Sequence, residues 1–125
     1  MIYGIGTDIV QTSRMEKIVQ KWGDRFLRRV FTDAEIEYCR DKPTPAARFA
    51  LRFAAKEAFL KALGLGVSQG LSLKHVEVVK TARGMPKVNL HGRTKELCEG
   101  KGIRRSFLSL SDDGLYAIAM VVLEV

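Results

Sequence analysis

A long, largely apolar helical stretch most constrains how this chain can fold. Thr44 is suited to cap its start, Pro45 to fill its first helical position and Gly64 to end it, so we expect a helix from about residue 45 to residue 63. One carboxylate, Glu57, interrupts the apolar residues of this helix. A charge among apolar neighbours is costly unless something compensates it, so Glu57 needs a partner.

The rest of the chain alternates between strand and helix patterns. Strands are expected at 2–10, 71–80, 87–91, 106–111 and 115–125. Shorter helices are expected to begin at the capping boxes Ser13/Glu16 and Thr32/Glu35, and to cover residues 94–99. The last strand is almost entirely apolar, which is typical of a strand in the middle of a sheet. We therefore predict a single α+β domain over residues 1–125, with about three helices, in which a mixed or antiparallel sheet packs against the long central helix and the shorter helices.

The composition is that of an ordinary globular protein, with 46% hydrophobic and 28% charged residues among 125. No apolar run approaches the roughly 20 residues of a membrane span, and the chain does not begin with a secretory signal pattern. Cys39 and Cys98 form no CxxC pattern, and the two Cys and two His lack the spacing of a zinc site. We expect two buried or half-buried thiols in a reducing, cytoplasmic setting, and no membrane partner.

The net charge of +7 and the pI of about 9.7 indicate a polyanionic partner. Nucleic acid, an acidic protein and a phosphate-rich small molecule all fit, and so does a charge that serves solubility alone. Six cations within 16 residues form the strongest candidate docking surface: Arg14, Lys17, Lys21, Arg25, Arg28 and Arg29. The first four are expected to share one face of the helix that follows Ser13.

A second carboxylate, Asp8, ends the apolar run of the first expected strand. Gly4 and Gly6 keep the backbone before it slim, which is typical of a strand that something approaches closely. Taken alone, Asp8 fits a cap for the next segment, and Glu57 with Lys61 fits a surface ion pair at i,i+4. Taken together, the two carboxylates suit a divalent metal.

Two other segments each allow two interpretations. Gly64–Gly66 could let a phosphate approach the backbone, although a helix end explains Gly64 more simply. Residues 112–114 could hold a metal, although a hairpin turn explains them better. His75 and His91 lie in expected strands without a partner at useful spacing, and we assign them no role.

Several motifs resemble those of the holo-acyl-carrier-protein synthase family, the small bacterial type of 4′-phosphopantetheinyl transferase. Gly4–Val10 and Arg52–Gly64 are similar to its two signatures, Gly84–Pro86 to its Gly-x-Pro turn, and Ser109–Ser111 to its C-terminal signature. The similarity covers essentially the whole chain, in order. One departure is Asp112, which stands where many members of the family carry His, so no His-like role carries over to that position.

The resemblance implies the 4′-phosphopantetheinyl transferase fold and a Mg²⁺-dependent enzyme of fatty acid biosynthesis. Such an enzyme moves phosphopantetheine from coenzyme A to a serine hydroxyl of apo-acyl carrier protein and releases adenosine 3′,5′-bisphosphate. The resemblance also implies a homotrimer with active sites at the subunit interfaces, and a first helix that docks the acidic carrier protein.

The motif match assigns roles to single residues. Asp8 and Glu57 would hold the metal and would be catalytic together with Lys61, which would contact the phosphate near the scissile bond. The residues implied to lie near the coenzyme are Arg52, Lys61, Gly64, Gly66, Pro86 and Ser109. The residues implied to bind the carrier protein are Arg14, Lys17, Lys21 and Arg25. The serine proton would pass to Glu57 or to a metal-bound water, and the sequence leaves both routes open.

Two other functions fit the residues taken alone. A small nucleic-acid-binding protein would use the same basic stripe. The chain lacks an RNP-like aromatic motif, a GXXG loop and a helix-turn-helix signature, however, and both carboxylates would be unexplained. A metal-dependent phosphohydrolase would use the same carboxylates with water in place of a protein hydroxyl. We expect the transferase, with no nucleic-acid partner.

Overall fold

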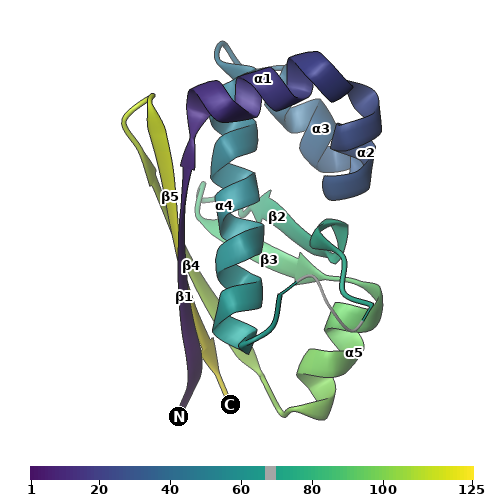
Figure 1. Cartoon of the computed structure of the whole chain (residues 1–125). Helices are drawn as coiled ribbons and strands as arrows, with labels where there is room; N and C mark the ends of the chain where they lie inside the picture. Colours follow the sequence, from purple (N-terminus) through teal and green to yellow (C-terminus); the bar gives the residue numbers. More distant parts are fainter. Residues whose placement is uncertain (67–69) are drawn as a thin grey trace.

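One long helix lies between a three-stranded sheet and a two-stranded sheet, and shorter helices close the two ends of the molecule (Figure 1). The structure is a computed structural model of the whole chain and describes residues 1–66 and 70–125. The elements follow in the order β1 (Ile2–Gln11), α1 (Thr12–Trp22), α2 (Asp24–Val30), α3 (Asp33–Arg40), α4 (Pro45–Leu63), the 3₁₀ turn η1 (Leu73–His75), β2 (Val76–Lys80), β3 (Pro86–Leu90), α5 (Gly92–Gly100), β4 (Arg105–Asp112) and β5 (Tyr116–Glu124).

All strand pairs among the described residues are antiparallel, so the predicted α+β class is confirmed and no mixed sheet is formed there. The larger sheet has the order β1-β5-β4, with the apolar β5 in its centre as predicted. Alternate residues of β5 are completely buried, namely Ala117, Ala119, Val121 and Leu123. The opposite face of this sheet is apolar but exposed at Ile5, Ile9, Phe107, Ile118 and Met120.

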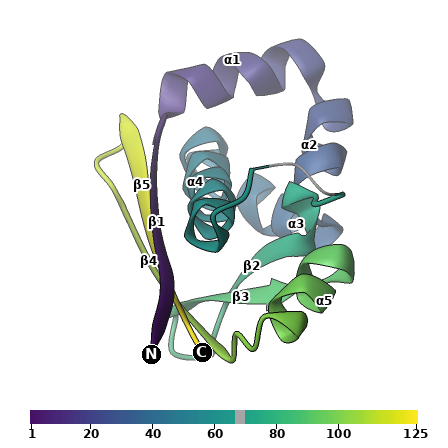
Figure 2. The ribbon, with the colours of Figure 1, turned by 60° about the horizontal axis from the view of Figure 1, so that its bottom comes forward.

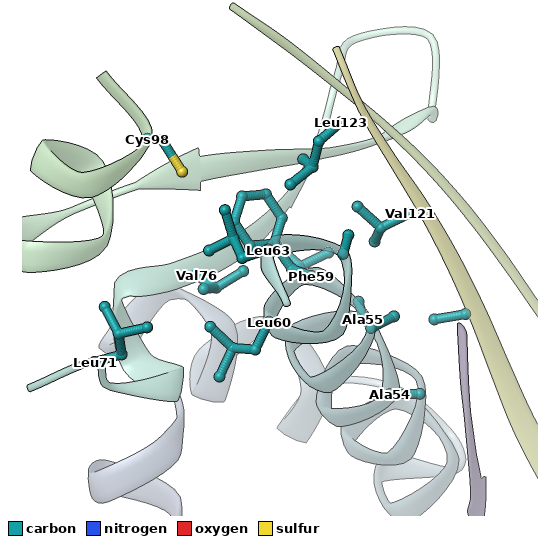
Figure 3. Packing of buried hydrophobic residues seen from close by; sticks show 14 residues of the cluster. Ala54, Ala55, Phe59, Leu60, Leu63, Leu71, Val76, Cys98, Val121 and Leu123 are labelled. Atoms are coloured by element: carbon teal, nitrogen blue, oxygen red, sulfur yellow. The ribbon is translucent and has the colours of Figure 1, made fainter. Parts of the chain in front are cut away.

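Helix α4 covers the buried face of the larger sheet (Figure 2). Phe59, Leu60 and Leu63 point from it into the main hydrophobic cluster, in which Val121 and Leu123 of β5 lie on one side and Leu60 points to the other, toward Leu71 and Val76 (Figure 3). The helix is apolar nearly all round because β2 and α3 pack against its other side. Thr44, Pro45 and Gly64 mark its ends as predicted, with Gly64 in the left-handed conformation at φ +79°, although Thr44 makes no side-chain capping bond.

The closest contact in the fold joins the backbone of β1 to the backbone of α4. A Cβ atom built on Gly4 would collide with the carbonyl oxygen of Ala62, and one built on Gly6 would collide with that of Ala58 and lie 2.7 Å from the Ala62 nitrogen. The close approach to the strand that was expected at these glycines is therefore made by the helix. This contact fixes how near the strand residue Asp8 comes to the side chains of α4.

Two of the expected boundaries are wrong. The Ser13/Glu16 capping box does not form, because β1 runs straight into α1 and the Thr12 N–H already donates to the Leu115 carbonyl at 2.8 Å. The strand expected from residue 71 begins only at Val76, because the Ser72 hydroxyl accepts from the Lys74 N–H and closes the turn η1. The Thr32/Glu35 capping box, in contrast, forms in full.

Helix α2 was not predicted from the sequence, and residues 1–66 and 70–125 form five α-helices where about three were expected. Gly23, with φ +55°, ends α1 and starts α2 without a loop between them. Arg25 therefore lies on α2 and not on the helix that carries Arg14.

We predict that Gly6→Ala destabilises the protein, because the added methyl group must push α4 away from β1. Forcing extra volume into a packed site costs about 1–3 kcal/mol in the free energy of unfolding. Urea unfolding measures this, with Gly100→Ala as the control. Apart from its chain neighbours and the backbone of its own helix, no atom lies within 4 Å of a Cβ at Gly100, and alanine suits its helical position. Equal stability of the two variants would contradict the close contact.

Candidate active site

Lys61 connects the carboxylate of β1 to the long helix. Its ammonium group donates to Asp8 Oδ1 at 3.0 Å and to the Thr7 carbonyl at 3.1 Å. The ion pair therefore crosses from α4 to β1, whereas the sequence suggested a pair between Lys61 and Glu57 along the helix. The Lys61 side chain is 56% exposed, so its ammonium group remains open to a ligand from solvent.

Glu57 lies half-buried next to this pair. Burial raises the pKa of Glu57, the negative charge of Asp8 raises it further, and the positive charge of Lys61 partly opposes both. The two carboxylates that the sequence singled out, 49 positions apart, thus influence each other directly.

A hollow of about 440 Å³ brings both carboxylates to one surface. Its polar lining comes from Asp8, Gln11, Arg14, Glu57 and Tyr116, and its apolar lining from Ile9, Val10, Met15, Ile18 and Phe53. The consecutive elements β1 and α1 meet here with α4 and with the first residue of β5, which are both distant from them in sequence. The hollow can accept an extended ligand that carries a charged end.

The residues of this site fit a Mg²⁺ ion that is completed by a substrate. Mg²⁺ is usually held by one or two carboxylates together with phosphate oxygens and water. Asp8 and Glu57 are such a pair, and a bound cation would relieve the repulsion that raises the pKa of Glu57. Within residues 1–66 and 70–125, no three His, Cys, Asp or Glu side chains gather into a metal site. Among these residues the candidate site is the pair of carboxylates, Asp8 and Glu57.

The other residues implied for the coenzyme fall into two groups. Gly64 and Gly66 follow α4 directly, at the end that carries Lys61. Pro86 begins β3 in the smaller sheet, and Ser109 is exposed on the outer side of β4, opposite Met120 of β5. Neither Pro86 nor Ser109 is among the described residues that line the hollow with Asp8 and Glu57.

Arg52 lies on α4, five residues before Glu57, and is only 4% exposed. Its guanidinium lies 4.0 Å from the centre of the Tyr38 ring, and its Nε has no hydrogen-bond partner. Lys42 and Lys80 also approach this ring, at 4.4 and 5.4 Å. Burial alone would raise the pKa of Tyr38, but hydrogen bonds and charges from Lys80 and Arg52 bring it below the ordinary value. No sequence signal pointed to this cluster, because its members come from α3, the segment between α3 and α4, α4 itself and β2.

The predicted carrier-binding cations spread over two helices. Arg14 borders the hollow, Lys17 and Lys21 follow it on α1, and Arg25 lies on α2 beyond the turn at Gly23. All four are exposed. They form a basic edge that begins at the carboxylates and leads away from them.

The remaining candidates have structural roles. Asp113 accepts hydrogen bonds from the Leu115 and Tyr116 N–H groups, which hold its pKa below the usual range and form the expected hairpin turn. Asp112 pairs with Arg48 at 3.1 Å.

Cys39 and Cys98 are buried and free, and burial raises the pKa of each to about 11. No helix in the described part of the chain has both the length and the apolar character needed to cross a membrane.

Comparison with known proteins agrees with this architecture. A family model described as the 4′-phosphopantetheinyl transferase superfamily matches residues 4–119. The holo-[acyl-carrier-protein] synthase of Geobacter sp. (strain M21) is 52% identical over 124 residues, which is 99% of each chain. The chain belongs to the holo-[acyl-carrier-protein] synthase family. The family predicted from the motifs is thereby confirmed.

Solved structures of this family have the same fold. The crystal structure of the Neisseria meningitidis holo-[acyl-carrier-protein] synthase superposes with a TM-score of 0.93 at 38% identity and covers 100% of both chains. The Helicobacter pylori enzyme, solved in complex with coenzyme A, superposes with a TM-score of 0.85 at 36% identity over 96% of this chain and 99% of that one.

The electrostatics of Glu57 predict that Glu57→Gln stabilises the protein at neutral pH. The pKa of Glu57 is raised in the fold above its ordinary value of 4.5, so the folded chain binds this proton more tightly than the unfolded chain. Stability therefore falls as pH rises from about 4 through the raised pKa, and stays lower above it. Thermal unfolding should show a higher midpoint for Glu57→Gln at pH 7, with the difference disappearing near pH 4.

The control for this measurement is Glu96→Gln on α5, which removes one exposed carboxylate outside the hollow. It should show no comparable rise at pH 7. A Glu57→Gln variant less stable than the unmutated chain at pH 7 would contradict the raised pKa.

Proposed function

We propose that this chain transfers 4′-phosphopantetheine from coenzyme A to a serine hydroxyl of apo-acyl carrier protein, in a Mg²⁺-dependent reaction that serves fatty acid biosynthesis in the cytoplasm. The observation that carries the proposal is the meeting of Asp8 and Glu57 at one hollow, with Lys61 paired to Asp8 beside it, in a member of the holo-[acyl-carrier-protein] synthase family. In the reaction a bond forms between the serine oxygen and phosphorus. The bond from phosphorus to the leaving adenosine 3′,5′-bisphosphate breaks.

Asp8 and Glu57 would hold the Mg²⁺ ion, which would neutralise charge on the pyrophosphate of the donor. Lys61 lies beside both carboxylates, and its exposed ammonium group can bind the transferring phosphoryl group. The serine proton would pass to Glu57 or to a water bound beside it. The raised pKa of Glu57 belongs to the site without a cation, because a bound cation would lower it again. Catalysis then rests on position and charge neutralisation.

Coenzyme A would extend from Asp8 and Glu57 over two groups of residues. Arg52, Gly64 and Gly66 belong to α4 and its end, close in sequence to Lys61. Pro86 begins β3 and Ser109 lies on the outer side of β4, on other elements than Lys61, which supports an active site completed by a second subunit. The unexplained cation cluster at Tyr38 includes Arg52 and suits a phosphate-rich donor.

A homotrimer with interfacial active sites would cover the exposed apolar face of the larger sheet. Ile9, Phe107 and Ile118 are 60%, 50% and 47% exposed on the outer side of β1, β4 and β5, where Ile9 lies opposite Ile118 and Phe107 lies opposite Val122. Ser109 belongs to the same face, so a subunit packed there would meet it. Light scattering tests this directly, since the molar mass of a single chain would overturn the trimer.

The function itself is tested by incubating the chain with coenzyme A, Mg²⁺ and apo-acyl carrier protein and measuring the intact mass of the carrier. A gain equal to one phosphopantetheine group is expected. An unmodified carrier together with hydrolysed nucleotide would indicate a phosphohydrolase instead.

We predict that Asp8→Ala and Glu57→Ala each lower the transfer rate by at least about 100-fold, the usual effect of removing one group that stabilises a transition state. Both variants should keep the circular dichroism spectrum of the unmutated chain. Glu96→Ala is the control and should transfer at the normal rate. Near-normal modification of the carrier by either site variant would count against the assignment.

The basic edge predicts how the carrier protein binds. Charge reversal at Arg14, Lys21 and Arg25 should raise KM for the acidic carrier by about tenfold or more, with a smaller effect at high salt. The control reverses three exposed cations elsewhere, Lys87, Lys95 and Arg104, and changes the net charge equally. If both triple variants affect KM alike, the net charge of the chain and not this edge guides the carrier.

A further inference from the structure

Lys56 and Glu35 form an ion pair that is sealed from solvent, with side chains 0% and 1% exposed. The ammonium group of Lys56 donates to Glu35 Oε1 at 2.8 Å, to the Leu73 carbonyl at 3.0 Å and to the Val76 carbonyl at 2.7 Å. Each of its three N–H bonds therefore has its own acceptor. This pair takes no part in the chemistry described above.

The carboxylate of Glu35 is bonded just as completely. Oε1 also accepts from the Thr32 N–H at 2.9 Å, and Oε2 accepts from the Val78 N–H at 2.9 Å. The Thr32 hydroxyl donates to Glu77 at 2.6 Å. The network ties α3, η1 and β2 to one point on α4. Buried charges with every partner in place fix geometry more than they add stability.

The position of Lys56 on α4 gives this geometry a consequence for the active site. Successive residues of an α-helix are turned by about 100° about its axis. Ala58 and Ala62, which contact the glycines of β1, therefore lie on the side of α4 roughly opposite to Lys56. Glu57 and Lys61 lie between these two anchor points, on the flank that borders Asp8.

We propose that Lys56, locked by Glu35, is a positioning residue for the transfer reaction, because it fixes the rotation of α4 that turns Glu57 and Lys61 toward Asp8. The inference rests on the proposed function. A helix with side chains has a radius of about 5–6 Å, so a rotation of about 10° moves a surface group by about 1 Å. A displacement of that size at a reacting group can lower the rate by about 100-fold.

The test compares three variants in the carrier-modification assay and in thermal unfolding. Lys56→Met keeps the length of the side chain and removes its hydrogen bonds. Glu35→Gln/Lys56→Met removes both charges, which often restores stability after a buried pair is broken. Val76→Ala is the matched control, because it opens a cavity beside the pair but leaves the Val76 carbonyl that accepts from Lys56.

We expect Lys56→Met and the double variant to lose between about 10-fold and 100-fold in kcat, with little change in KM for coenzyme A. Val76→Ala should lose stability but keep its kcat at temperatures where it is folded. If the double variant recovers kcat together with stability, or if Val76→Ala loses as much kcat as Lys56→Met, the inference about Lys56 is overturned. The proposed function is unaffected by either result. Absence of transfer by the unmutated chain would instead overturn the proposed function and this inference with it.

Discussion

The backbone of β1 lies directly against the backbone of α4, and this contact brings Asp8 within reach of the side chains of α4. Without it the active site could not form. Asp8 belongs to a strand and Glu57 to a helix, and side chains between such elements normally keep their backbones well apart. Gly4 and Gly6 remove that spacing on the strand, and the small side chains of α4 remove it on the helix. Asp8, two residues beyond Gly6 on the same face, can then reach Lys61 at 3.0 Å. Every proposal about the chemistry depends on this approach.

The charges at the site are arranged unfavourably for the stability of the fold. Glu57 is partly withdrawn from water next to the like charge of Asp8, and Lys61 compensates only in part. Such strain is common where groups are arranged for chemistry and not for stability. At the neighbouring position of the same helix, burial lowers the pKa of Lys56, and the charge and hydrogen bond of Glu35, together with the charge of Glu77, oppose that effect. The two situations differ because Lys56 has a complete set of partners and Glu57 has room for a ligand.

The sequence was informative wherever a local rule decides the structure. The Thr32/Glu35 capping box, the glycine end of α4 and the central position of β5 follow from such rules and were predicted. The start of α1 was not predicted correctly, because a hydrogen bond to the distant Leu115 sets it. Helix α2 was missed because Gly23 joins two helices without a loop. The pairing of Lys61 with Asp8 and the cluster at Tyr38 bring together residues that are far apart in sequence, and no local pattern contains them.

Asp8 and Glu57 are proposed to share one divalent cation. Crystals grown with coenzyme A and with Mn²⁺ in place of Mg²⁺ test it most directly, because the anomalous signal of Mn²⁺ locates the ion without assumptions about its ligands. We expect a single peak with a carboxylate oxygen from each of the two residues at about 2.1 Å and donor phosphate oxygens completing the shell. A peak bound to only one carboxylate, or one outside the hollow, would contradict the account.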